Sequence, residues 1–335
     1  MNLRVLSTTA WLLTAVSTWA QGPNNSGTYY LQADMQMGEN LKTTLSTIIY
    51  NRTERTYKQL WTDFQTTDAR DNGKVWDMYS NKREFTFGTD QAGNYKSEGD
   101  VYNREHSFPN SWFGGEVQPM YTDLHHLYPT DGYVNNKRGN YPFGETDGES
   151  YKSANNFSKL GKCTYEGYTG IVFEPNDEYK GDFARTYFYM VTCDEEKLPD
   201  WYANFGNKEG VKPTIDGSKY PGLAAWQLKM LMEWSKKDPV SEKEINRNNA
   251  VYSIQRNRNP FIDYPGLEEY IWGDKINVRF SYDNYGTAGI RLTDAGQSDE
   301  PAAFYSPDGR QLPYKQRGLN IVRMKSGRIM KVLEN

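Results

Sequence analysis

The chain has 335 residues, which is enough for one large domain or two smaller ones with a sizeable buried core. The formal net charge of -4 excludes a global positive field, so any nucleic-acid site has to be a local basic patch. No apolar run long enough to span a membrane follows the N-terminal segment.

Residues 1–20, MNLRVLSTTAWLLTAVSTWA, have the pattern of a secretory signal peptide. Arg4 supplies the positive start, a short apolar stretch begins at Trp11, and the small Ala20 precedes a cleavage point at Gln21. The alternative is an ordinary N-terminal helix, and the polar segment QGPNNSGTYY that follows argues against it. We therefore expect a secreted or cell-surface protein.

Residues 41–68 are expected to be helical, because apolar residues recur at the spacing of one helix face at Leu41, Leu45, Ile48 and Ile49. Residues 71–100 are polar and turn-rich, with short strand-like pieces at 74–80 and 83–87.

Two later segments, 181–193 and 222–238, also have helical periodicity. Ser241 and Glu244 form a capping box that predicts the start of another helix. That helix cannot continue beyond Asn259, because two prolines follow.

The composition changes near residue 275. A strand is expected over 276–282, then a Gly-, Asp- and Ser-rich stretch, and then two small hairpins with turns at SPDG and KSGR. The expected organisation is therefore a main domain over 21–275, a linker over 276–300 and a small all-β tail over 301–335.

The two cysteines, Cys163 and Cys193, could pair in an oxidising compartment or remain as two buried thiols. A thiolate zinc finger is excluded, because it would need more cysteines.

All three histidines of the chain, His106, His125 and His126, fall within 21 consecutive residues. The pieces VYNREHSFP and TDLHHLYP are strand-like, and Thr130 or Asp131 is placed to cap the short helix DGYVNNKRGN. Neighbouring strand residues point to opposite faces, so at most one of His125 and His126 easily reaches a shared site, and the other role for them is structural.

Glu105, beside His106, and Asn135, from the short helix, supply oxygen ligands of the kind that Mg²⁺ prefers, with Ca²⁺ or Mn²⁺ as alternatives. For Glu105 and His106 to serve one site, the strand has to bulge or end there. His106 could take a proton from an attacking water, and Arg138 or another arginine could hold a phosphate.

At these residues the chain resembles the endonuclease I family of secreted and periplasmic bacterial nucleases. Four stretches carry the resemblance across roughly residues 40–275: YNREHSFPNSWF, TDLHHLYPTDGYVNNKRGN, FEPNDEYKGDFARTYFYM, and the later WSKKDPVSEKEINRN with QRNRNPFIDYP.

The resemblance implies an α+β fold with mixed helices around a ββα-metal (His-Me finger) motif. It further implies His106 as general base, Glu105 and Asn135 as Mg²⁺ ligands, and products with a 5′-phosphate and a 3′-hydroxyl. Asn135 is preferred over Asn136 because it stands three residues before Arg138, as in the family's Asn-x-x-Arg.

One departure from the family concerns the phosphate-binding arginine. Periplasmic members carry it in an insertion between the two strands, whereas the connection over 107–122 here is short and has no Lys or Arg. The arginine then has to come from elsewhere, with Arg138, Arg185 and Arg258 as candidates. Arg138 and Arg185 are expected to act in catalysis. The substrate contacts are assigned to Arg104, Arg258 and Asn259.

The expected function is a monomeric, Mg²⁺-dependent endonuclease that contacts DNA and RNA through the phosphate backbone, with little sequence preference. The tail, GLNIVRMKSGRIMKVLEN especially, resembles the C-terminal sorting segment of type IX secretion, which would make the secretion machinery a partner. One alternative is a secreted surface protein that binds an anionic polymer without cutting it. Another is a zinc hydrolase built on the adjacent histidines, which fits poorly because no helical His-Glu-x-x-His is present.

Overall fold

The computed structural model falls into two compact units, one running to Tyr285 and the other beginning at Gly286. It describes residues 21–91, 94–285, 301–306, 310–324 and 329–334. The expected signal peptide lies outside this range. No helix in the described ranges is long and apolar enough to cross a membrane.

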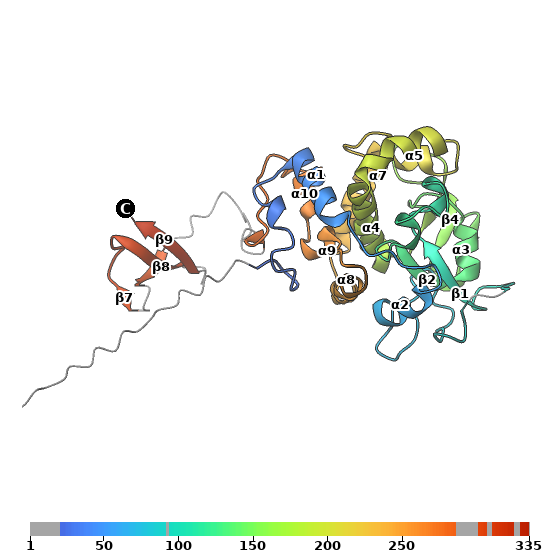
Figure 1. The fold of residues 1–335 in the computed structure, drawn as a ribbon, viewed down its shortest axis with the longest axis horizontal. Helices are drawn as coiled ribbons and strands as arrows, with labels where there is room; N and C mark the ends of the chain where they lie inside the picture. The colour runs from blue at the N-terminus through green and yellow to red at the C-terminus, as the bar shows by residue number, and fades with distance from the viewer. Residues whose placement is uncertain (1–20, 92–93, 286–300, 307–309, 325–328, 335) are drawn as a thin grey trace, which may run out of the picture. The chain divides into compact units, whose positions relative to one another are not determined.

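Helices make up most of the regular secondary structure described in the first unit, and Figure 1 labels the larger ones. The α-helices are α1 (Gly38–Ile49), α2 (Leu60–Thr67), α3 (Gly132–Arg138), α4 (Lys180–Cys193), α5 (Leu198–Phe205), α6 (Val211–Thr214), α7 (Ala225–Lys237), α8 (Glu242–Gln255), α9 (Pro260–Asp263) and α10 (Leu267–Ile271). Short 3-10 helices are η1 (Leu31–Ala33), η2 (Asn110–Trp112), η3 (Met120–Thr122), η4 (Ala154–Asn156), η5 (Asp177–Tyr179) and η6 (Glu195–Lys197).

The strands form small antiparallel sheets. In the first unit β1 (Tyr102–His106) pairs with β2 (Leu127–Asp131), and a second sheet has the order β3 (Tyr151–Lys152), β4 (Lys159–Lys162) and β5 (Ile171–Glu174). In the second unit the order is β7 (Gln311–Leu312), β6 (Pro301–Tyr305), β8 (Gly318–Met324) and β9 (Ile329–Glu334). The expected α+β class with a small β tail is confirmed.

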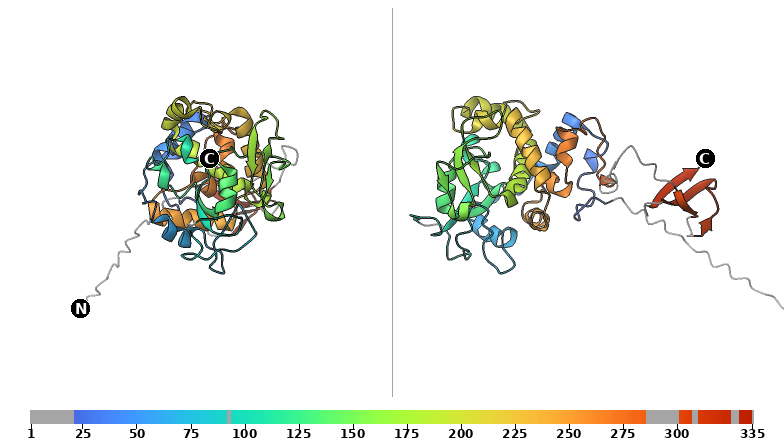
Figure 2. Two further views of the ribbon diagram at one scale, coloured as in Figure 1. Left: turned by 90° about the vertical axis from the view of Figure 1, so that its right-hand side faces the viewer. Right: turned by 180° about the vertical axis from the view of Figure 1, so that it is seen from behind.

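Helix α4 is the centre of the first unit, and every residue from Gly181 to Cys193 is buried. It packs against α1, α7 and α9. Figures 1 and 2 place α1 and α10 on one side of α4, and β1, β2 and α3 on the other. A helix buried all round carries large apolar side chains on every face, which explains the aromatic run YFY in its sequence, and its buried polar residues, such as Arg185, find partners inside the fold. The ββα unit therefore rests on a rigid helical core.

The helix expected over 41–68 is wrong in its middle, because α1 ends at Ile49 and α2 begins at Leu60. Between these two helices the chain is not helical and makes tertiary contacts. Thr53 N donates to the carbonyl of Gln255, and the Arg52 side chain is buried against Asp123 and Asp194.

The strands expected at 74–80 and 83–87 are also wrong, since only isolated bridges form there, such as Lys74 with Thr86. The second strand of the ββ pair starts at Leu127, later than TDLHHLYP predicts. Asp123 turns the chain instead, because its carboxylate accepts from His125 N and its carbonyl accepts from His126 N.

The strand expected over 276–282 does not form, and these residues pack onto the first unit. Phe280 is fully buried, its N–H donates to Gln36 and its carbonyl accepts from Met35. The first unit therefore extends past the expected boundary at 275. The two expected hairpins of the tail do pair, as β6 with β7 and β8 with β9. Residues 307–309 and 325–328 of their turns lie outside the described ranges.

Candidate active site

The site is built on a ββα unit whose register is continuous. Glu105 of β1 lies opposite Tyr128, and His106 lies opposite Leu127, with no bulge between them. Strand β1 ends at His106. A strand end, like a bulge, allows two adjacent residues to serve one site. Asp131 then begins α3, because its carboxylate accepts from the N–H groups of Tyr133 and Val134.

Glu105 is a buried carboxylate with a defined set of donors. Its Oε1 accepts from the Tyr79 hydroxyl at 2.7 Å and lies 3.2 Å from Arg138 Nη1. Burial raises the pKa of Glu105, and Arg138 and Tyr79 oppose that shift because they stabilise the ionised form. The carboxylate also accepts from the backbone N–H of His106 and from the Asn135 side chain.

Asn135 lies on α3 facing this carboxylate. Its Nδ2 donates to Asn103 Oδ1 at 2.7 Å, and its side chain also hydrogen-bonds Glu105. Asn136, the neighbouring alternative, is exposed. Glu105, Asn135 and Asn103 together bring carboxylate and amide oxygens to one place, and this donor set fits a hard divalent cation.

His106 is buried at the end of β1, and its Nε2 lies 2.9 Å from the carbonyl oxygen of Tyr121. A carbonyl can only accept, so Nε2 carries the proton and Nδ1 holds the lone pair. The ring stacks on that of Tyr121 at 5.2 Å between centroids. Burial, followed by the charge of His126, lowers the pKa of His106 to about 3, so the imidazole is neutral.

Arg138 is brought to the site, where its side chain is buried. Its Nη1 contacts Glu105 and donates to the carbonyl of His106, and its Nη2 donates to the carbonyl of Ser107 at 2.6 Å. These contacts tie Arg138 to the end of β1, and its expected catalytic role stays a prediction.

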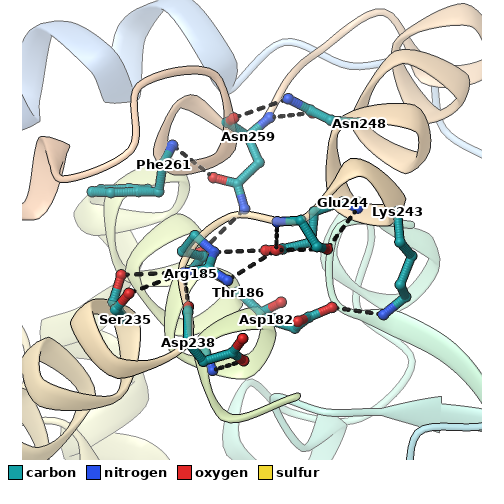
Figure 3. A network of polar contacts seen from close by, with 12 residues as sticks. Asp182, Arg185, Thr186, Ser235, Asp238, Lys243, Glu244, Asn248, Asn259 and Phe261 are labelled. Atoms are coloured by element: carbon teal, nitrogen blue, oxygen red, sulfur yellow. Dashed lines mark hydrogen bonds and ion pairs between the residues drawn. The ribbon is translucent and has the colours of Figure 1, made fainter. Parts of the chain in front are cut away.

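Arg185 and Asn259 belong to a polar network elsewhere, shown in Figure 3. Arg185 donates from Nε and Nη2 to both oxygens of Glu244, at 2.6 and 2.9 Å. Asn259 caps α9 through the N–H of Phe261, and its Nδ2 donates to the Arg185 carbonyl. The structure therefore does not bring Arg185 and Asn259 together with Glu105 and His106, and both are paired inside the fold.

Arg258 is likewise buried, with Nε and Nη2 each 2.7 Å from an oxygen of Asp263. This bidentate pair engages Arg258 with a carboxylate inside the fold, and its expected contact with substrate stays a prediction.

Arg104, which is expected to contact substrate, lies beside the site. It lies on β1 two positions before His106, and its guanidinium carbon sits 3.5 Å from the Tyr57 ring centroid and 4.2 Å from that of Trp61. Its Nη1 donates to the Tyr57 carbonyl at 2.6 Å.

His125 and His126 are both buried, and each ring meets a backbone carbonyl. His126 Nε2 lies 2.7 Å from Met120 O, and His125 Nε2 lies 3.3 Å from Asn257 O. Burial lowers the pKa of both imidazoles. These contacts favour the structural role.

The two cysteines are free thiols, Cys193 buried in α4 and Cys163 partly exposed.

The sequence reasoning missed Tyr79, Tyr57 and Tyr121, which hold the carboxylate and the imidazole. Tyr79 and Tyr57 are far from the histidine cluster along the chain, and Tyr121 acts partly through its carbonyl. Nothing in their local sequence marks them, since tyrosine is abundant throughout this chain.

Comparison with known proteins identifies the family of this chain. The chain matches Endonuclease I over residues 37–266. It belongs to the endonuclease I family. It is 36% identical over 253 residues to an extracellular ribonuclease of Bacillus amyloliquefaciens, covering 73% of this chain and 78% of that protein. An extracellular ribonuclease of Bacillus subtilis is 35% identical over 256 residues, with 74% and 79% covered. A periplasmic deoxyribonuclease of Aeromonas hydrophila is 29% identical over 150 residues, 44% of this chain and 50% of that protein. Family membership identifies the chain as a nuclease.

Proposed function

We propose that the chain is a secreted, divalent-metal-dependent endonuclease that hydrolyses phosphodiester bonds in both RNA and DNA. The observation that carries the proposal is the grouping of Glu105, Asn135 and a neutral His106 at one end of the ββα unit. Relatives named as extracellular ribonucleases and as a periplasmic deoxyribonuclease support secretion and both substrates. Mg²⁺ is the proposed ion, and the active form is proposed to be a monomer.

Within this proposal His106 is the general base. Its Nδ1 lone pair accepts a proton from the attacking water, while Nε2–H stays bonded to the Tyr121 carbonyl and keeps the ring oriented. A bound phosphodiester brings negative charge next to the imidazole, which raises its affinity for that proton. The proposed products carry a 5′-phosphate and a 3′-hydroxyl.

Glu105 and Asn135 would hold the metal, with Tyr79 and Arg138 keeping the Glu105 carboxylate ionised and oriented. When bound, Mg²⁺ would offset the charge that builds on the phosphate and the leaving oxygen. Contacts to phosphate and sugar carry no sequence information, so cleavage is expected at many sites. The sorting role of the C-terminal tail stays a proposal.

The test is cleavage of supercoiled plasmid and of single-stranded RNA by the mature protein, with Mg²⁺ or with EDTA. We expect Mg²⁺-dependent cutting that His106→Ala abolishes, and that Asn135→Ala weakens far more than the matched surface variant Asn136→Ala. Cutting supported by Zn²⁺ and not by Mg²⁺ would favour the zinc hydrolase. Folded protein that cuts neither substrate with any metal would favour the polymer-binding alternative.

A further inference from the structure

Arg104 stands at one end of a row of aromatic rings that leads to the proposed base. Its guanidinium lies over Tyr57, Tyr57 stacks on Tyr121 at 4.5 Å between centroids, and Tyr121 stacks on His106 at 5.2 Å. The guanidinium carbon also lies over the Trp61 ring, 4.2 Å from its centroid. Arg104 and His106 are also two residues apart on β1, so their side chains leave the same face of the strand.

The charge of Arg104 is balanced differently from that of the buried arginines. Five arginine side chains that are buried in the first unit each meet at least one carboxylate oxygen within 3.3 Å. These pairs are Arg52 with Asp123 and Asp194, Arg138 with Glu105, Arg185 with Glu244, Arg247 with Asp68, and Arg258 with Asp263. In the part of the chain that the structure describes, no carboxylate pairs with Arg104, which donates to the Tyr57 carbonyl and also hydrogen-bonds the Tyr57 side chain.

We infer that Arg104, held between Tyr57 and Trp61, is the phosphate-binding arginine of this nuclease. The inference rests on the proposed function and assigns the group that the short connection over 107–122 does not supply. A guanidinium has five N–H donors in a planar fork that matches phosphate geometry. The contact to Tyr57 leaves most of those donors for a phosphate oxygen pair.

The aromatic neighbours explain why an arginine without a carboxylate can be kept here. Ring faces attract the cation and fix the plane of the fork, but they do not occupy its N–H edge as a carboxylate would. A side chain that is already ordered loses less entropy when the ligand arrives. The half-buried cation is therefore oriented for an anion that the substrate brings.

The experiment measures binding separately from cleavage. Every protein carries His106→Ala, so that a fluorescein-labelled single-stranded DNA oligonucleotide stays intact in EDTA, and its anisotropy is followed over a range of NaCl concentrations. Arg104→Gln is expected to weaken binding by about tenfold, the effect of losing one charge-assisted contact. It should also reduce the slope of log affinity against log salt by about 0.7, the value for one single-strand phosphate.

Arg55→Gln is the matched control, because it removes the same charge from a neighbouring arginine that is already paired with Asp63. It should keep the parent's slope. Arg104→Lys keeps the charge but not the fork, so it should bind more weakly with an unchanged slope, and it replaces Arg104→Gln if that protein does not fold.

Binding by Arg104→Gln with the parent's affinity and slope would overturn the inference, as would an equal loss in Arg55→Gln. Plasmid cleavage by the protein with an intact His106 reports on the proposed function independently. Salt-dependent binding through Arg104 without any cleavage would retain this inference and reject the nuclease mechanism.

Discussion

Tyr79→Phe is the sharpest single test of how the metal-binding carboxylate is held. The change removes one hydroxyl, which donates to Glu105 Oε1 at 2.7 Å in a fully buried setting. A hydrogen bond to a charged group contributes about 2 kcal/mol to stability, so the free energy of unfolding should fall by about that amount. Losing a donor that orients a metal ligand typically lowers metal affinity by about tenfold or more. The Mg²⁺ concentration for half-maximal cleavage should rise accordingly.

Tyr189→Phe separates this effect from general destabilisation. Its hydroxyl is equally buried and donates to a carboxylate oxygen of Asp123 at 2.7 Å, outside the proposed metal site. Both variants should lose similar stability in urea unfolding in EDTA, but only Tyr79→Phe should shift the Mg²⁺ titration of oligonucleotide cleavage. An unchanged Mg²⁺ titration for Tyr79→Phe, or the same shift in both variants, would refute the role given to Tyr79.

Three further predictions concern the scaffold. Arg185→Met leaves Glu244 buried without its bidentate partner, so urea unfolding should show a loss of about 3 kcal/mol or more, while cleavage per folded molecule is kept. Asp131→Ala removes the cap of α3 and should cost about 1 kcal/mol in the same assay. Burial holds the pKa of His125 at about 4, below the usual 6.5, so the unfolded chain binds the proton more tightly. This contribution of about 3 kcal/mol is complete above pH 6.5 and is lost as the pH falls towards 4. Equal stability of the parent at about pH 7.5 and about pH 5, with His125→Gln showing the same profile, would contradict it.

Local signals in the sequence were sufficient for the elements that local chemistry determines. Ser241 and Glu244 form both halves of the predicted capping box at α8, and Asp131 caps α3. Helix α8 ends at Gln255, before the limit that the two prolines set at Asn259, and the two hairpins of the tail pair as expected. Each of these depends on residues a few positions apart, which is the range over which sequence patterns are informative.

The remaining predictions failed because they depend on contacts between residues that are far apart in the sequence. One helix is predicted over 41–68, but its apolar spacing stops at Ile49, and in the segment that follows Arg52 is buried against Asp123 and Asp194. The same applies to Tyr79, whose role depends on Glu105 in a different element. A periodic pattern reports which face is apolar, and it does not report which distant polar group will need a partner.

The arginines show why charge in the sequence is a poor guide to a phosphate site. Arg185 and Arg258 lie in stretches that carry the family resemblance, yet each is neutralised by a carboxylate inside the fold. Burying a cation without a partner is costly, so arginines enclosed by the core acquire carboxylates and stop contributing to the surface field. An arginine that serves a substrate has to avoid such a partner while remaining ordered. Stacking on aromatic rings satisfies both conditions, and Arg104 has that setting two residues from the proposed base. For a protein of net negative charge, recognition of a polyanion then depends on where unpaired cations are kept and not on how many arginines the chain contains.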